Sequence, residues 1–229
     1  MNIRKIKFKI WLFSIVVLSV LTSSTTITGE PIESARFPSL ISSLKIDANL
    51  TFCMERVPLE IRDVRERLEK DLMLSLWDRP QVILWLKRSH RYLPHIEQTL
   101  KEGGLPDDLK YVAIAESALR PHVGSRKGAM GFWQFMVGTG RKYGLVINRR
   151  IDERRNIFAS TKAVVQYFKD LYDDFGSWTL AVAAFNMGED GLMAEILEQG
   201  INDYYKLYLS LETQRYLFRI LSIKMIFTD

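Results

Sequence analysis

Near the middle of this 229-residue chain, residues 105–119 have the sequence LPDDLKYVAIAESAL. A proline suited to a first helical turn and two acids at the positive end of a helix dipole predict that a helix begins here. Pro121 predicts its end. Within this helix Glu116 is the only ionisable group after Tyr111, and its neighbours are small. A carboxyl group that loses water there has a raised pKa and can donate a proton near neutrality. From this stretch alone, a partly exposed helix-end glutamate without function remains the simpler interpretation.

The flanking sequence also has helical periodicity, with apolar stripes separated by charged residues. Upstream, helices are predicted over about residues 61–72, 80–90 and 94–103. Downstream, helices are predicted over about residues 132–143, 164–175, 178–185, 189–199 and 211–227. No segment alternates for long enough to predict a strand. The expected fold is therefore all-α, or nearly so.

The first 29 residues have the pattern of an export signal: a basic start, an apolar run over residues 10–21, and a small, polar stretch. It would be cleaved, or retained as an N-terminal membrane anchor. Removing its four cations lowers the formal net charge from +5 to +1. No basic run with interleaved aromatic residues follows, so nucleic acid is not an expected partner.

Cys53 is the only cysteine, which excludes an internal disulfide and a multi-cysteine metal site. A small buried apolar residue is its simplest interpretation, and a reactive thiol is the alternative. His90, His95 and His122 lack the spacing of metal ligands. We expect no metal and no cofactor.

Two later clusters bear on the role of Glu116. Residues 128–136 set glycines and aromatic residues around Gln134, which suits a sugar site because apolar faces pack on pyranose rings and an amide binds hydroxyl or acetamido groups. A tightly packed core turn would have the same composition. Residues 183–189 end a helix with Asn186 before a glycine. Alone, Asn186 is a common feature of a helix C-terminus.

In this order and spacing, the three clusters resemble the soluble lytic transglycosylase (SLT) catalytic domain of the lysozyme-like superfamily. Glu116-Ser117 matches the family's glutamate-serine motif, residues 128–134 its Gly-Leu-Met-Gln type motif, and residues 184–186 its Ala-Tyr-Asn motif. Further agreement lies in residues 139–145, 152–157 and 212–216. Leu105-Pro106 and Trp133 are most similar to the membrane-bound lytic murein transglycosylase D branch. The resemblance covers about residues 80–227.

The sequence also departs from the family pattern. Phe185 replaces the tyrosine of the Ala-Tyr-Asn motif, so any role of that hydroxyl is absent. Trp133-Gln134 stands where the second motif usually has Met-Gln, as in the resembled branch. No lysin-motif repeats follow the resembling region, so affinity for the cell wall is expected to come from the groove or from partners.

The resemblance implies a role for each site residue. Glu116 would be the single catalytic carboxylate, and Ser117 would hydrogen-bond the substrate or that carboxylate. Gln134 and Asn186 would hold acetamido sugars. Tyr216 would line the site, or would be a core residue of the last helix. Four side chains are expected either to form groove walls or to pack in the core: Met130, Phe132, Trp133 and Phe185.

The implied activity is peptidoglycan lytic transglycosylation, which cleaves the β-1,4 bond between N-acetylmuramic acid and N-acetylglucosamine and leaves 1,6-anhydromuramyl ends. Ordinary glycosidases pair two carboxylates, and the other acids considered, at positions 107, 108, 152 and 153, do not offer the second one. A hydrolase like goose-type lysozyme and a non-catalytic peptidoglycan-binding protein are the alternatives. The expected partners are glycan strands and envelope protein complexes, and the expected location is the periplasm or cell envelope.

The predicted organisation has four parts. Residues 1–29 form the signal peptide or anchor, and residues 30–55 form a linker. Residues 56–103 form a small helical N-terminal region, and residues 104–229 form the lysozyme-like catalytic domain.

Overall fold

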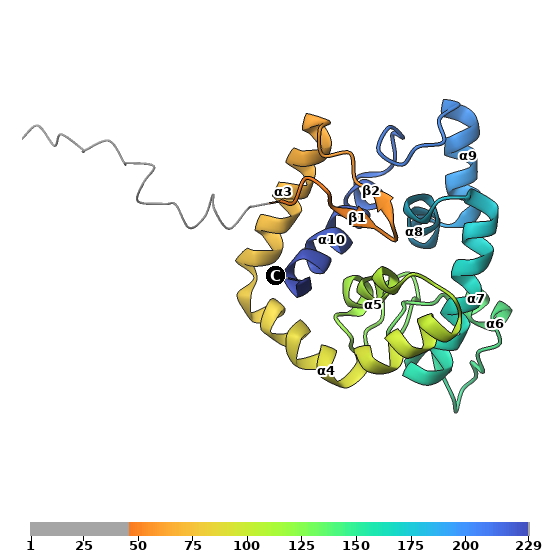
Figure 1. Cartoon of the computed structure of the whole chain (residues 1–229). Coiled ribbons are helices and arrows are strands. Elements are labelled where there is room, and N and C mark those ends of the chain that lie inside the picture. Colours follow the sequence, from red (N-terminus) through yellow and green to blue (C-terminus); the bar gives the residue numbers. More distant parts are fainter. Residues whose placement is uncertain (1–45, 229) are drawn as a thin grey trace, which may run out of the picture. The chain divides into compact units, whose positions relative to one another are not determined.

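A computed structural model describes residues 46–228. The predicted export signal and the first part of the linker lie outside the described residues. The described chain is helical apart from one small antiparallel hairpin, β1 (Thr51–Phe52) with β2 (Glu55–Arg56), which confirms the predicted fold class (Figure 1). Within residues 46–228, no helix combines the length and the apolar character needed to cross a membrane.

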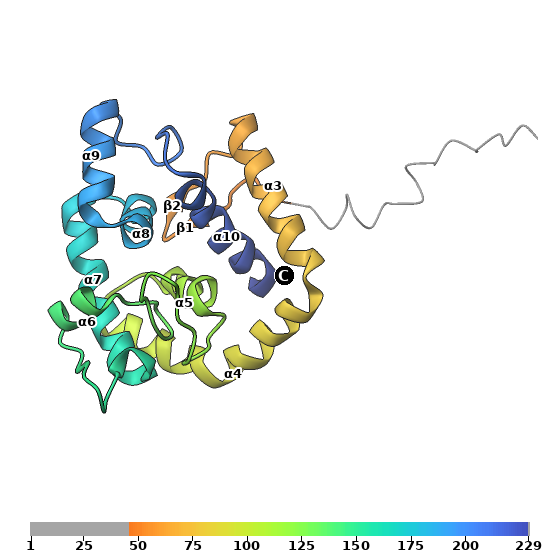
Figure 2. The same ribbon diagram turned by 180° about the vertical axis from the view of Figure 1, so that it is seen from behind.

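The helices, with two short 3-10 turns, are α3 (Arg62–Trp77), α4 (Arg79–Glu102), η2 (Asp107–Leu109), α5 (Lys110–Ser117), α6 (Val137–Lys142), η3 (Glu153–Arg155), α7 (Ile157–Phe175), α8 (Trp178–Met187), α9 (Glu189–Gln199) and α10 (Leu211–Thr228). Helix α10 is the central element, because α3, α5 and α8 all pack against it, while α7 packs on α8 and α4 (Figures 1 and 2). Leu217, Phe218 and Leu221 of α10 are fully buried. A helix that is apolar on most of its circumference belongs in a core, and this one gathers segments that are far apart in the sequence.

An ion pair joins α3 to α10. The buried carboxylate of Asp71 accepts a hydrogen bond from Arg215 Nη2 at 2.6 Å. The guanidinium group of Arg67, also on α3, lies 4.6 Å from the centre of the Phe218 ring. The region predicted as a separate N-terminal part therefore packs directly on the central helix.

The hairpin, which the sequence did not predict, is tied to two other elements. The carboxylate of Glu55 accepts hydrogen bonds from the backbone N–H groups of Trp178 and Thr179, at the start of α8. Such a carboxylate compensates the free N–H groups and the positive end of the helix dipole. Asp108 accepts from the Cys53 N–H group at 2.7 Å and from Lys224 Nζ of α10 at 2.8 Å. Residues 51–56 thus serve as a cap and a brace for the helices.

Some predicted helix boundaries were wrong. Residues 80–90 and 94–103 belong to one bent helix, α4, with Pro94 inside it (Figure 1). Pro94 removes one backbone hydrogen bond, but it lies on the exposed side, while the stripe that includes Trp85, Leu93 and Ile96 stays buried along the other side. Burial of that stripe keeps the helix continuous. Helix α6 is shorter than the predicted 132–143, because its first residues form a turn.

Candidate functional site

Helix α5 presents Glu116 in its last turn. Tyr111, Val112, Ala113 and Ile114 are consecutive and all buried, so this part of the helix is enclosed on most of its circumference. Glu116 is half-buried. The helix ends at Ser117 rather than near Pro121, because Ala118 and Leu119 adopt left-handed backbone conformations with φ of 52° and 57°. Two hydrogen bonds hold this end: the Ala118 N–H group donates to the Ile114 carbonyl oxygen at 2.8 Å, and Arg88 Nη1 donates to the Ala118 carbonyl oxygen at 3.1 Å. The chain therefore turns away immediately after the carboxyl group.

The carboxyl group of Glu116 meets α10 at Tyr216, whose hydroxyl donates a hydrogen bond to Glu116 Oε1. Burial raises the pKa of Glu116 to about 7, against the opposing effect of the Tyr216 hydrogen bond. Charge on Arg219 lowers that pKa and charge on Glu212 raises it. Burial and the nearby carboxyl also raise the pKa of Tyr216 well above its ordinary value, so the phenol stays protonated. Near neutral pH this site holds a carboxyl group that can give up and recover a proton.

Ser117 is buried and links α5 to the glycine-rich loop of residues 124–135. Its Oγ lies 2.8 Å from the carbonyl oxygen of Phe132 and 3.1 Å from that of Ala113, and its hydrogen can be donated to either. In this structure the hydroxyl is directed at backbone oxygens rather than at the carboxyl group of Glu116. A direct role of Ser117 in substrate binding stays a prediction.

A buried arginine holds the glycine-rich loop in place. Arg154 donates to the carbonyl oxygens of Gly128 at 2.8 Å and Phe135 at 3.0 Å, while Asp152 accepts from the same guanidinium group at 2.8 Å. Gly131 has a φ of 83°, and a Cβ atom there would lie 1.8 Å from the Arg154 carbonyl oxygen. Only glycine permits this approach. The 152–157 motif is thus a clamp for the loop that carries Gln134.

The loop fixes the direction of the Gln134 amide. Gln134 has a φ of 48°, and its Nε2 donates to the carbonyl oxygens of Val123 at 2.9 Å and Gly131 at 2.8 Å. No donor among the described residues bonds its Oε1. Because an amide nitrogen has only two hydrogens, Gln134 can offer a ligand an acceptor and no donor.

Asn186 has the opposite arrangement. It lies in the last turn of α8, and its Oδ1 accepts a hydrogen bond from Thr213 Oγ1 at 3.0 Å. No acceptor among residues 46–228 is bonded to its Nδ2. Thr213 and Tyr216 are three residues apart on α10 and share a face of it. One face of α10 therefore orients both Asn186 and Glu116.

Of the four aromatic and methionine side chains considered for the groove walls, two are buried in the core and two are half-buried. Phe132 and Trp133 are buried in the core, where Trp133 Nε1 donates to Thr161 Oγ1 at 3.1 Å, so neither forms a groove wall. Phe185 is half-buried and stacks on Phe168 with ring centres 4.8 Å apart. Met130 is half-buried and packs beside Gly124.

The structure adds residues that the sequence interpretation missed. Glu212 and Arg219 are exposed charges of α10 whose fields reach Glu116, and Thr213 orients Asn186. Glu212 and Thr213 lie four and three residues before Tyr216, and Arg219 lies three residues after it, so all three are near Tyr216 on the helix surface. That signal was available once Tyr216 was assigned to the site.

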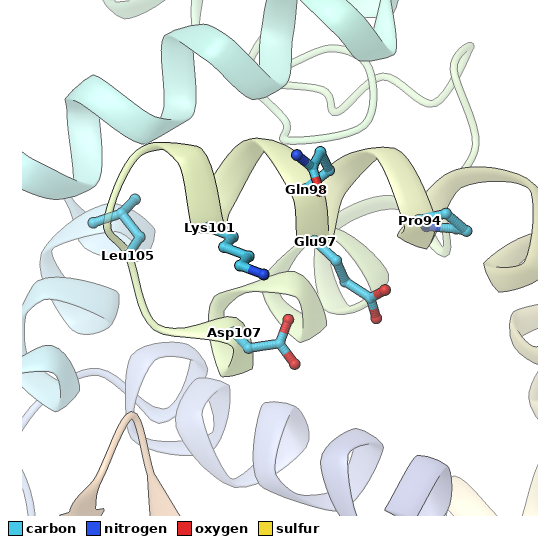
Figure 3. A pocket seen from close by; sticks show the side chains of 6 residues that line it. All are labelled: Pro94, Glu97, Gln98, Lys101, Leu105 and Asp107. Carbon is cyan, nitrogen blue, oxygen red and sulfur yellow. The ribbon is translucent and has the colours of Figure 1, made fainter.

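Two hollows lie on the surface of the described residues, one lined by residues of α6 to α9 and one lined by α4 and the segment after it. One, of about 390 Å³, is lined by Gly138, Thr139, Lys142, Tyr167 and residues 187–191, which directly follow Asn186 in the sequence. The other, of about 570 Å³, is lined by Pro94, Glu97, Gln98, Lys101, Leu105 and Asp107 (Figure 3). None of the predicted site residues lines either hollow. Within the part of the chain that the structure describes, no three His, Cys, Asp or Glu side chains gather as metal ligands.

Residues 94–208, half of the chain, match the family model described as the Transglycosylase SLT domain. The chain belongs to the SLT domain family. A curated relative is "Membrane-bound lytic murein transglycosylase D" of Escherichia coli (strain K12), which is 36% identical over 141 residues, or 59% of this chain and 31% of the relative. Another is the "Putative tributyltin chloride resistance protein" of Alteromonas sp. (strain M-1), which is 30% identical over 117 residues, or 50% of this chain and 56% of that protein.

Among solved structures, the 70 kDa soluble lytic transglycosylase SLT70 of Escherichia coli matches this SLT domain with a TM-score of 0.53 and 17% identity. The match covers 71% of this chain and 29% of that one, and it shows the shared fold. The chain spans about a third of the first curated relative and about half of the second. What those whole proteins do is therefore a starting point for a proposal.

Proposed function

We propose that this protein is a peptidoglycan lytic transglycosylase. Glu116 supplies the observation that carries the proposal: a half-buried carboxyl with a pKa of about 7 that is hydrogen-bonded by Tyr216, on the face of α10 that also orients the Asn186 amide through Thr213. The family, and the names of the Escherichia coli relatives as lytic transglycosylases, support the same reaction class.

In the proposed reaction, Glu116 first gives its proton to the oxygen that bridges N-acetylmuramic acid to N-acetylglucosamine. The bond from muramyl C1 to that oxygen breaks, and the 2-acetamido group stabilises the cationic C1. The Glu116 carboxylate then removes the proton from the muramyl 6-hydroxyl as O6 bonds to C1. Glu116 regains its proton, no water is consumed, and the products are a free N-acetylglucosamine 4-hydroxyl and a 1,6-anhydromuramyl end.

The two amides would recognise acetamido groups in complementary ways. Gln134 has a free acceptor and suits the acetamido N–H group, whereas Asn186 has free donors and suits the acetamido carbonyl oxygen. Met130 and Phe185 would border the sugar rings. Ser117 would act mainly by holding the Gln134 loop against α5.

We propose residues 104–229 as the catalytic domain and residues 56–103 as its support, through the pair of Asp71 with Arg215. The substrate places the enzyme in the cell envelope, and the leader of residues 1–29 would export it to the periplasm, either cleaved or kept as an anchor. Envelope protein complexes are then available as partners.

A hydrolase is the second candidate, because Glu212 is a carboxylate whose charge reaches Glu116. In that reaction water, rather than O6, would attack C1. The test is digestion of purified peptidoglycan followed by mass analysis of the muropeptides. The lyase produces ends that are one water lighter than reducing ends, and reducing ends alone would exclude it.

The Glu116→Gln variant extends this test. We expect turnover to fall by about 10²–10⁴-fold, as for loss of a general acid and base, with binding to peptidoglycan retained. Glu198→Gln, at an exposed position on α9, is the matched control and should keep full activity. If Glu116→Gln retained every activity, the non-catalytic binding protein would be the better description.

A further inference from the structure

Apolar side chains gather on the outer surface where α3 meets α4. Seven large apolar residues are exposed within fourteen positions: Met73, Leu74, Leu76, Trp77, Ile83, Leu84 and Leu86. Trp77 is 89% exposed. We call residues 70–91 the corner surface. Scattered exposed apolar residues are ordinary, but a concentration of this kind marks an interaction site.

These side chains are not needed for packing within the fold. Helix α3 buries the opposite side, with Val64, Leu68 and Leu72 facing inward, and α4 buries Trp85 and Ser89. Apart from Ser75, the last turn of α3, residues 74–77, is apolar. The corner surface therefore has an outward apolar face that no described part of the chain covers.

The same surface is basic. Lys70, Arg79, Lys87 and Arg91 are exposed, and none of them forms an ion pair with a carboxylate of residues 46–228. The acids in this range are otherwise engaged: Asp71 is buried against Arg215, and Asp78 caps α4 by accepting from the Gln81 N–H group. No acid occurs between positions 79 and 96. The corner surface thus combines apolar side chains with a net positive charge, because five Lys and Arg side chains outnumber two Asp side chains in residues 70–91.

We propose that the corner surface binds an anionic lipid bilayer at its interface. Apolar side chains with a tryptophan enter the boundary between headgroups and acyl chains, while long basic side chains reach back to lipid phosphates. The charge argues for a bilayer rather than a second copy of the chain, since a symmetric contact would place the same four cations against each other. This inference is independent of the proposed chemistry at Glu116.

The test uses the full 229-residue chain with a solvatochromic dye on Ile83→Cys, and Leu197→Cys on α9 is the matched control. Leu197 is 75% exposed and α9 lies across the fold from α3 and α4 (Figures 1 and 2). Cys53 is buried and does not compete for the dye. Vesicles of phosphatidylcholine with and without phosphatidylglycerol carry brominated lipid as quencher. Any binding through the N-terminal leader is common to both dye positions.

With phosphatidylglycerol present, the dye at position 83 should be quenched severalfold more than the dye at position 197. Salt at about 0.5 M should remove the difference, because it shortens the Debye length from about 10 Å at 0.1 M to a few ångströms and so screens the attraction between the basic side chains and the lipid phosphates. Equal quenching at both positions would overturn the proposal. So would a lipid-free, concentration-dependent shielding of position 83, since that result indicates self-association.

Charge variants test the electrostatic part. Replacing Arg79, Lys87 and Arg91 by Gln should weaken the position-83 response to phosphatidylglycerol vesicles by about fivefold for each charge removed. The control replaces the exposed Arg126, Arg149 and Arg150 by Gln, which removes the same net charge elsewhere. If both triple variants weakened the response equally, net charge rather than the corner surface would be responsible, and the proposal would be wrong.

Discussion

Two consecutive residues of α10 hold two carboxyl groups in different ways. Arg215 faces α3 and pairs with Asp71, while Tyr216 faces α5 and donates to Glu116. In the first contact a full positive charge compensates a buried carboxylate. In the second a neutral hydroxyl leaves a carboxyl with a pKa of about 7. Helix α10 therefore supplies a charged partner to a buried acid on α3 and a neutral partner to the half-buried carboxyl group of Glu116 on α5.

Asp71→Asn should have the largest effect on stability, because it leaves the Arg215 charge uncompensated. We expect a loss of about 3 kcal/mol in the free energy of unfolding, at the low end for a buried pair since Arg215 is 36% exposed. Urea denaturation measures it. Activity per folded molecule should be unchanged. Asp63→Asn, in an exposed pair of the same helix, should cost less than about 1 kcal/mol. Equal losses in the two variants would mean that the pair of Asp71 with Arg215 stabilises the fold no more than an exposed ion pair does.

Glu116→Gln should stabilise the protein above neutral pH. The folded-state pKa of about 7 exceeds the ordinary value of 4.5, so the folded state binds more protons between these values and stability falls as the pH rises through them. The variant removes this loss of stability. Its free energy of unfolding should exceed that of the wild type by about 2 kcal/mol at pH 8, after allowance for the partial exposure of Glu116. Little gain is expected at pH 4. A gain that is the same at both pH values would contradict the raised pKa.

Tyr216→Phe should move the pH dependence of the reaction. The Tyr216 hydrogen bond lowers the pKa of Glu116, so its loss raises that pKa, by up to about one unit. Since the protonated form is the acid, kcat/KM should fall above about pH 7 in the wild type and at a higher pH in the variant. If the alkaline limb of the profile of kcat/KM against pH, where kcat/KM falls, did not move in the variant, a group other than Glu116 would control it.

The smallest effects should come from the two exposed charges of α10. Glu212→Gln removes a negative charge that raises the pKa of Glu116, and Arg219→Gln removes a positive charge that lowers it. The alkaline limb should therefore move down in the first variant and up in the second, by a few tenths of a unit, and about 1 M salt should abolish both shifts. Shifts of the same sign would exclude a Coulombic origin.

Local signals in the sequence predicted much of the fold. Gly176 and Ser177 marked the boundary between α7 and α8, and the glycines at 188 and 200 bracket α9 as expected. Pro94 misled the prediction, because burial of a continuous apolar face outweighed one lost hydrogen bond. The end of α5 was missed because Ala118 and Leu119 have no local signal for a left-handed conformation; tertiary contacts impose it.

The site was predictable in its residues more than in its contacts. Resemblance indicated Glu116, and the structure brings it together with Tyr216 from 100 positions away. The amide directions of Gln134 and Asn186 depend on Val123, Gly131 and Thr213, which no pattern within either motif reveals. The substrate contacts of these amides stay predictions. Gly131 is only three positions from Gln134, but Val123 and Thr213 lie 11 and 27 positions from the amides that they orient.

The position of α10 in the chain also sets an order of events during synthesis. Its contacts reach back 100 residues to Glu116 and 144 residues to Asp71. Because translation proceeds from the N-terminus, α3 and α5 emerge from the ribosome well before the helix around which they pack. The core and the proton-exchanging carboxyl are completed together when residues 211–228 appear. Proteins with such long-range contacts fold slowly, and here a nascent chain has no assembled site until then.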